Sequence, residues 1–93
     1  MTTKTVRFNR AGIAKLPDDK PVVYKIETDG GKNNYTGVAQ RGRVRERLEW
    51  HLADGRISGT KVRIEQASSI DEARAREQRI IARMQPKYNR LGR

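Results

Sequence analysis

The chain has 93 residues, of which 21 are Lys or Arg and 11 are Asp or Glu, giving a formal net charge of +10 at pH 7. With 34% hydrophobic residues it has enough apolar material for one small domain and only a small core. It contains no cysteine and one histidine. This excludes a disulfide framework, a thiolate nucleophile, a cysteine-based metal site and a multi-histidine metal site.

The charge and the hydropathy pattern indicate the surroundings in which the protein works. No segment approaches the roughly 18 apolar residues of a membrane span, and the opening sequence MTTKTVRFNR lacks the apolar run of a secretory signal. We therefore expect a soluble, intracellular protein of the cytoplasm, associated with the nucleoid and not with a membrane. A field this positive attracts polyanions, of which nucleic acid is the commonest. A generic basic protein of the ribosomal type is the alternative.

The first part of the chain predicts a weakly ordered start followed by a β-hairpin. Residues 1–8 are expected to be mobile or weakly ordered, and Asn9 is placed to cap a short helical turn. Residues 22–28 read as a strand because β-forming and alternating side chains follow one another there. The Asp-Gly-Gly turn at 29–31 supplies the positive φ angles that a hairpin needs, and residues 35–39 form the return strand.

Two helices and a third strand complete the predicted elements. Residues 43–54 are expected to form a helix because apolar side chains recur at four-residue spacing. Residues 61–65 alternate as a strand, and a capping pattern that begins at Ser69 predicts a last helix over about 70–84. This order indicates one α+β domain over residues 1–93, with a small three-stranded antiparallel sheet flanked by helices.

Glu77 is a charged residue on the apolar face of the last predicted helix. It lies four positions after Ala73 and four before Ile81, where a carboxylate is costly to desolvate unless it is paired or binds a cation. One interpretation is a buried salt bridge to one of the many arginines. The other is a ligand for Mg²⁺, which prefers oxygen and often takes only one or two protein carboxylates.

Four further side chains are candidates for chemistry on a phosphodiester. Tyr24 and Tyr35 face each other across the predicted hairpin; either is an ordinary strand residue or a general base whose pKa of about 10 is lowered by nearby cations. Arg47 has the planar fork that suits phosphate charge in a transition state, although it is equally explained as a solvated helix residue. His51, one helical turn away, is either a proton shuttle or a helix-capping residue.

In order and spacing, these residues resemble the GIY-YIG endonuclease family. The first signature of the family corresponds to residues 22–24 (Val-Val-Tyr) and the second to residues 35–37 (Tyr-Thr-Gly). Residues 47–51 resemble the arginine-to-histidine helix pattern, Glu77 the metal-binding glutamate, and residues 86–89 the closing proline-to-asparagine segment. Within the family, the chain is similar to the N-terminal nuclease domain of the excinuclease members.

The chain departs from the family pattern at three positions. Val22 replaces the first glycine, Thr36 replaces the central isoleucine of the second signature, and Val38 stands where some members carry a lysine. The basic segment before Arg47 is also longer than in many relatives. The choice among Arg43, Arg45 and Arg47 as the catalytic arginine therefore stays open, with Arg47 preferred for its spacing to His51.

The resemblance implies a hydrolytic nuclease with a single Mg²⁺ or Mn²⁺ ion bound by Glu77. Tyr24 would deprotonate the attacking water, Tyr35 and His51 would order the proton network, and Arg47 would stabilise the pentacovalent phosphate. The implied catalytic residues are Tyr24, Tyr35, Arg47, His51, Glu77 and Asn89, the last supporting the site from its rim. The expected nucleic-acid-binding residues are Arg41, Arg43, Arg45 and Lys87.

We therefore expect a metal-dependent DNA endonuclease with low sequence specificity, or with a preference for a DNA structure such as a branch, flap or nick, because phosphate contacts carry little sequence information. Its pathway would be DNA repair or that of a mobile element. A protein partner or a homodimer would supply the second cut of a double strand. The alternative is a non-catalytic nucleic-acid-binding module that retains the nuclease fold.

Overall fold

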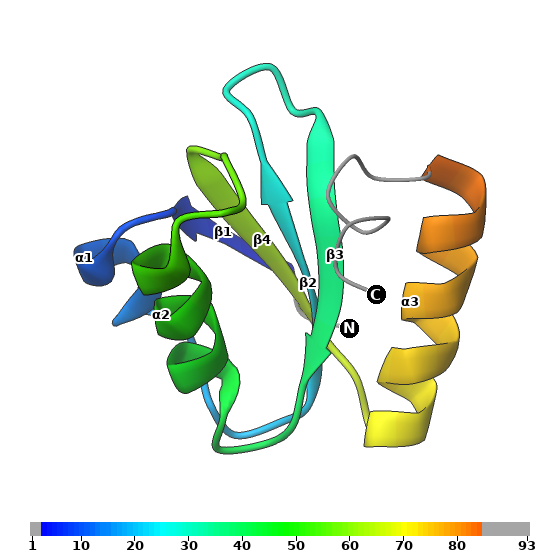
Figure 1. The fold of residues 1–93 in the computed structure, drawn as a ribbon. Coiled ribbons are helices and arrows are strands. Elements are labelled where there is room, and N and C mark those ends of the chain that lie inside the picture. The colour runs from blue at the N-terminus through cyan, green and yellow to red at the C-terminus, as the bar shows by residue number, and fades with distance from the viewer. Residues whose placement is uncertain (1–2, 85–93) are drawn as a thin grey trace.

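A computed structural model describes residues 3–84 of the chain. Figure 1 shows its elements, which in chain order are β1 (Thr3–Arg7), α1 (Arg10–Ile13), β2 (Val22–Glu27), β3 (Asn33–Ala39), α2 (Val44–Asp54), β4 (Lys61–Gln66) and α3 (Ile70–Met84). The four strands form one sheet in the order β1-β4-β2-β3, with every neighbouring pair antiparallel. The predicted α+β class is confirmed, whereas the predicted number of three strands is wrong.

The additional strand comes from the start of the chain, where Thr3–Arg7 forms a strand that the sequence did not predict. Thr3–Arg7 pairs with β4 over its whole length, so that Thr3 lies opposite Glu65 and Arg7 opposite Lys61. Its side chains are mostly exposed, because an edge strand is held by backbone hydrogen bonds to one neighbour more than by burial. The short helix α1 follows directly, and Asn9 caps it by accepting a hydrogen bond from the Gly12 amide at 2.7 Å.

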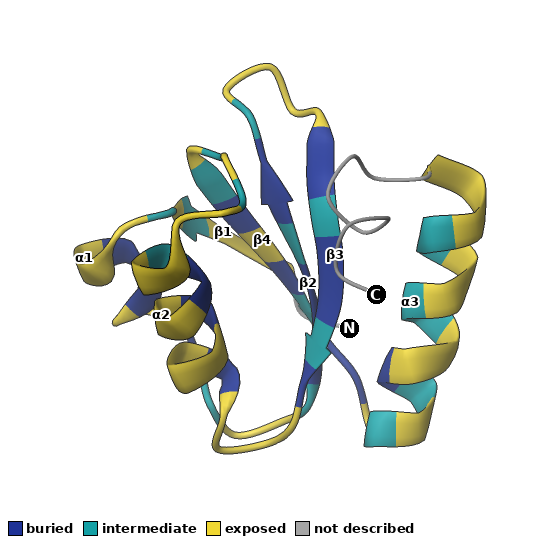
Figure 2. Cartoon of the chain, viewed as in Figure 1, coloured by how far each residue is buried: buried dark blue, intermediate teal, exposed yellow. Residues whose placement is uncertain are grey.

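The helices lie on both faces of the sheet, with α1 and α2 on one side and α3 on the other (Figure 1). Alternation along β2 sends Val22, Tyr24 and Ile26 into the larger apolar cluster beneath α1 and α2. Val23 points to the opposite face, into a smaller cluster with Ala73 of α3. The strands between these two layers are the most buried part of the molecule (Figure 2). The predicted alternation of side chains along β2 is confirmed.

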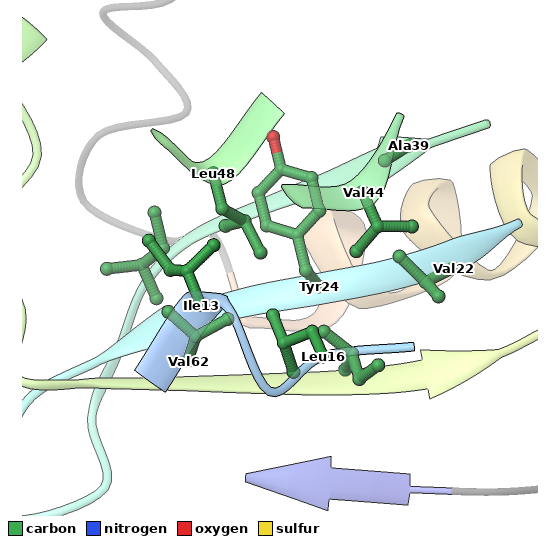
Figure 3. Packing of buried hydrophobic residues seen from close by; sticks show 10 residues of the cluster. Ile13, Leu16, Val22, Tyr24, Ala39, Val44, Leu48 and Val62 are labelled. Carbon is green, nitrogen blue, oxygen red and sulfur yellow. The ribbon is translucent and has the colours of Figure 1, made fainter. Parts of the chain in front are cut away.

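Tyr24 is the largest fully buried side chain of the core. Figure 3 shows its ring packed beside Leu48 and Val44 of α2, with the hydroxyl oxygen directed away from the aliphatic side chains. The ring reaches this position because Gly37 lies opposite Tyr24 on β3. A Cβ atom at Gly37 would lie 2.6 Å from Tyr24 Oη and 2.7 Å from Tyr24 Cζ. Gly37 is thus required by the close approach of the phenol ring to the β3 backbone.

The loop before β2 fixes the start of α2. Asp18 accepts a hydrogen bond from the Val44 amide through Oδ1 at 2.7 Å, and its carbonyl accepts another from the Gly42 amide at 2.8 Å. The helix ends at Gly55, which has a φ angle of 75° and donates to the His51 carbonyl at 3.1 Å. Both ends of α2 are therefore set by specific hydrogen bonds. Among the helices of residues 3–84, none has the length and apolar character to cross a lipid bilayer.

We predict that Gly37→Ala destabilises the protein and displaces Tyr24. The added methyl group would overlap the phenol oxygen and ring carbon described above, and overpacking of a well-filled core costs about 1–3 kcal/mol. Urea unfolding at neutral pH measures the loss of free energy.

Gly30→Ala is the matched control for this experiment. A Cβ atom at Gly30 meets nothing nearer than Thr28 Oγ1 at 3.9 Å, so the same chemical change in the hairpin turn should alter the free energy of unfolding by less than about 1 kcal/mol. If the two variants unfold at the same urea concentration, Gly37 is not needed for the approach of Tyr24.

Candidate active site at the edge strand

A tyrosine–histidine cluster, formed by Tyr24, Tyr35 and His51, lies between the sheet and α2. Tyr24 Oη and His51 Nε2 are 2.7 Å apart and hydrogen-bonded, and both residues are buried. The Tyr35 ring of β3 lies 6.1 Å from the Tyr24 ring and 5.0 Å from the His51 ring, measured between centroids. Residues from β2, β3 and α2 thus meet at one place, where edge strand β3 borders α2.

Burial and three residues, Tyr35, Arg47 and Glu77, set the electrostatic environment of the Tyr24 hydroxyl. Burial raises the pKa of Tyr24 well above its ordinary value, and the charges of Tyr35 and Glu77 raise it further. Arg47 acts in the opposite direction, because both its positive charge and its hydrogen bonding to the phenol lower the pKa. Tyr24 is therefore protonated at neutral pH, and Arg47 on α2 and Glu77 on α3 both lie close enough to influence its proton.

His51 is neutral in the folded protein. Burial, followed by the positive charge of Arg47, lowers the pKa of His51 to about 4, and Asp54 offsets only part of this shift. Its Nδ1 atom is buried and has no hydrogen-bond partner within residues 3–84. In one tautomer the Tyr24 hydroxyl donates to Nε2, and in the other Nε2–H donates to the phenol oxygen. In the first, the imidazole is ready to accept the proton of Tyr24.

The three candidate arginines of the basic segment are engaged differently. Arg43 pairs with Glu46 at 2.6 Å on the surface, and Arg45 donates through Nε to the Leu16 carbonyl at 2.8 Å. Only Arg47 among the three acts on the pKa of Tyr24. The geometry therefore agrees with the preference for Arg47.

Arg41, Lys87 and Asn89 are the remaining predicted site residues. Arg41 is exposed in the turn before α2, at a distance in sequence of more than one helical turn from Arg47. Lys87 and Asn89 lie outside the described residues. Of the six predicted catalytic residues, the structure thus brings together Tyr24, Tyr35 and His51 and places the charges of Arg47 and Glu77 within reach of them.

Sequence reasoning assigned no role to two residues beside the cluster, Trp50 and Arg74. They line a pocket of about 470 Å³ together with Arg43 and Arg47. A signal for Trp50 was present, because this aromatic residue lies off the apolar stripe that Val44 and Leu48 form on α2. For Arg74 nothing in the sequence pointed to the neighbourhood of α2.

The donor chemistry of the site fits a single magnesium ion better than a fully protein-ligated metal. Within residues 3–84 no three His, Cys, Asp or Glu side chains gather as a ligand set. Mg²⁺ commonly takes one or two carboxylates and completes its coordination with water and substrate phosphate. Glu77 on α3 offers such a carboxylate. Its side chain is half-buried, and its negative charge raises the pKa of Tyr24.

Comparisons of the chain with models of protein families, with curated proteins and with solved structures find no match. The relation to GIY-YIG endonucleases therefore stays a prediction from the motifs and their spacing. The arguments that follow depend on the geometry and electrostatics of the site.

We predict that His51 titrates with a pKa of about 4 in the folded protein, against about 6.5 for an exposed imidazole. The chain has one histidine, so NMR spectroscopy of the ring follows this group without overlap, and the ring nitrogen shifts report its tautomer. A midpoint near 6.5 would show that the imidazole is hydrated and not enclosed by the cluster.

The same shift makes stability depend on pH. Because the unfolded chain binds a proton at His51 below about pH 6.5 and the folded protein does not, the free energy of unfolding should fall between pH 6.5 and 4 by roughly 2–3 kcal/mol from this residue. Urea unfolding of the wild type and of His51→Gln separates this effect from that of the carboxylates. Parallel pH profiles for the two proteins would contradict it.

Proposed function

We propose that the protein is a metal-dependent endonuclease that hydrolyses DNA phosphodiester bonds. The observation that carries this proposal is the buried hydrogen bond between Tyr24 and His51, next to an arginine that acts on the same hydroxyl. A tyrosine and a histidine that serve packing alone need no guanidinium that hydrogen-bonds to the phenol. Nucleophile activation by proton transfer does need both a proton acceptor and a positive charge beside it.

The proposed proton relay rests on the hydrogen bond between Tyr24 and His51. Because burial raises the pKa of Tyr24, the phenol stays protonated at neutral pH. The hydroxyl therefore does not act as a base on its own. His51 is neutral, and in the tautomer that carries its proton on Nδ1 it accepts at Nε2. As an attacking water gives its proton to the Tyr24 oxygen, Tyr24 passes its own proton to His51. One O–H bond breaks in the water and another in the phenol, while a new O–H and a new N–H form.

The other residues position the groups of this relay or compensate the negative charge of the phosphate. Tyr35 packs against both rings and holds them in place. Arg47 is exposed on α2, so its guanidinium is free to contact a phosphate while it acts on Tyr24. Glu77 would hold Mg²⁺ or Mn²⁺, and the bound ion would supply positive charge at the scissile phosphate.

The overall charge of the chain supports DNA as the substrate. A net charge of +10 concentrates a polyanion at the surface. The exposed arginines around the site give phosphate contacts that do not depend on sequence. We therefore propose low sequence specificity, or selection by DNA structure.

We predict that Glu77→Gln abolishes cleavage and leaves DNA binding intact. The amide keeps the size of the side chain and removes the charge that holds the ion, so the cleavage rate should fall by roughly 10²-fold or more. The measurement is nicking of supercoiled plasmid with Mg²⁺, Mn²⁺ or EDTA, alongside a filter-binding assay. Glu49→Gln, an exposed carboxylate of α2, is the control and should cleave like the wild type.

The same assay separates the two functions that the sequence left open. Cutting that requires the metal and disappears with Glu77→Gln supports the nuclease. If the wild type binds DNA but neither ion produces a cut, the protein is a non-catalytic nucleic-acid-binding module instead.

We predict that Tyr24→Phe removes most of the cleavage while the fold survives. The ring continues to fill the core, but His51 loses its hydrogen-bond partner and the relay loses its first acceptor, which should reduce the rate by roughly 10²–10⁴-fold. Single-turnover cleavage measures the rate. Urea unfolding should show a loss of about 1–3 kcal/mol, because the buried His51 imidazole is left unpaired, and an unchanged cleavage rate would rule Tyr24 out of the relay.

A further inference from the structure

Trp50 is exposed on the surface immediately beside the tyrosine–histidine cluster. Its side chain is 56% accessible, and it is the single tryptophan of the chain. The Trp50 ring meets the His51 ring edge-on, with 5.3 Å between centroids. A lone exposed apolar residue is common on protein surfaces, so exposure alone implies no function. What implies a function is the position of Trp50 in a pocket that is also lined by arginine side chains.

This pocket lies where α2, α3 and the end of β3 come together. Its volume of about 470 Å³ is in the range of small-ligand sites, and it is lined by Trp50 and Arg47 of α2, Arg74 of α3 and the β3 residues Val38 and Ala39. Figure 1 shows α2 and α3 on opposite sides of β3, so the pocket spans the edge of the sheet. Arg47 belongs both to this pocket and to the candidate active site.

The charge of the pocket is positive. Arg43 also lines it but is paired with Glu46 at 2.6 Å, so these two largely cancel. Arg47 and Arg74 are left to attract an anion. An exposed indole beside uncancelled guanidinium groups is the combination with which proteins bind single-stranded nucleic acid, since the ring stacks on a base and the cations contact its phosphates.

We propose that this pocket, here named the Trp50 pocket, binds one unpaired base of the DNA strand whose phosphate lies at Arg47. A base inside a duplex is covered on both faces by its neighbours, and it stacks on a side chain only after it leaves the helix. The pocket therefore selects DNA with a single-stranded segment, such as a flap, branch or bulge. This inference rests on the proposed function for the position of the strand, and it names the substrate class of the same site.

Trp50 fluorescence tests the stacking without any cleavage. The protein is titrated in EDTA with three probes: an oligothymidylate, an abasic strand of equal length and charge, and a fully paired blunt-ended duplex of two strands. Stacking on a base quenches the indole, so the oligothymidylate should quench it and the abasic strand should not. Equal quenching by the base-bearing and abasic strands would overturn the proposal, because the contact would then be purely ionic.

Two variants test the same contact through affinity. Trp50→Leu should weaken binding of labelled oligothymidylate about tenfold, as expected for the loss of one stacked base, whereas Trp50→Phe should keep most of it. Both variants should bind the duplex like the wild type, and because Trp50 is exposed, both should unfold like it. An equal loss for single strand and duplex, or no loss for either, would refute base stacking.

The outcomes distinguish failure of the Trp50 pocket from failure of the nuclease. Base-dependent quenching in a protein that cuts nothing with Mg²⁺ or Mn²⁺ would support the pocket and reject hydrolysis. Metal-dependent cutting of flap and duplex at equal rates, unaffected by Trp50→Leu, would support hydrolysis and reject the pocket.

Discussion

The hydrogen bond between Tyr24 and His51 joins the sheet to α2 inside the core, and much of the structure serves to make it possible. Both groups are buried and hydrogen-bonded at 2.7 Å. In so apolar a setting an unpaired hydroxyl or imidazole would cost about 1–3 kcal/mol. The pair therefore specifies how α2 lies on the sheet, in addition to the packing of Val44 and Leu48. The position of α2 and the position of the reactive proton are set by the same contact.

Gly37 is also needed for this hydrogen bond, because a side chain at this position would occupy the space of the Tyr24 ring. Because the Tyr24 ring approaches the backbone of β3 opposite this residue, no larger side chain fits there. Tyr24 of β2 and Gly37 of β3 therefore form a matched pair. Because Gly37 has no side chain, the Tyr24 ring has room beside the β3 backbone. Tyr35 lies two positions before Gly37 on the same strand and closes the other side. The spacing of Tyr35 and Gly37 thus follows from packing around Tyr24.

The sequence predicted the elements whose signals are local, and it missed those that depend on distant partners. Alternation and helix capping identified β2, β3, α2, β4 and α3 to within two residues at most ends. Strand β1 carries no apolar alternation and exists because β4, far along the chain, offers a free edge. The choice among the three candidate arginines also depended on contacts that only the three-dimensional structure shows. Spacing only favoured Arg47, whereas the ion pair of Arg43 and the backbone contact of Arg45 show why those two are engaged elsewhere.

One helix presents both the candidate chemistry and the candidate recognition of DNA. On α2, Arg47, Trp50 and His51 lie within four positions of one another, and at 3.6 residues per turn they occupy adjacent sides of the helix. His51 turns inward to Tyr24, Trp50 turns outward to the pocket, and Arg47 borders both. A base stacked on Trp50 would hold the strand within one helical turn of the relay. Selection of an unpaired base and positioning of the phosphate would then be a single binding event.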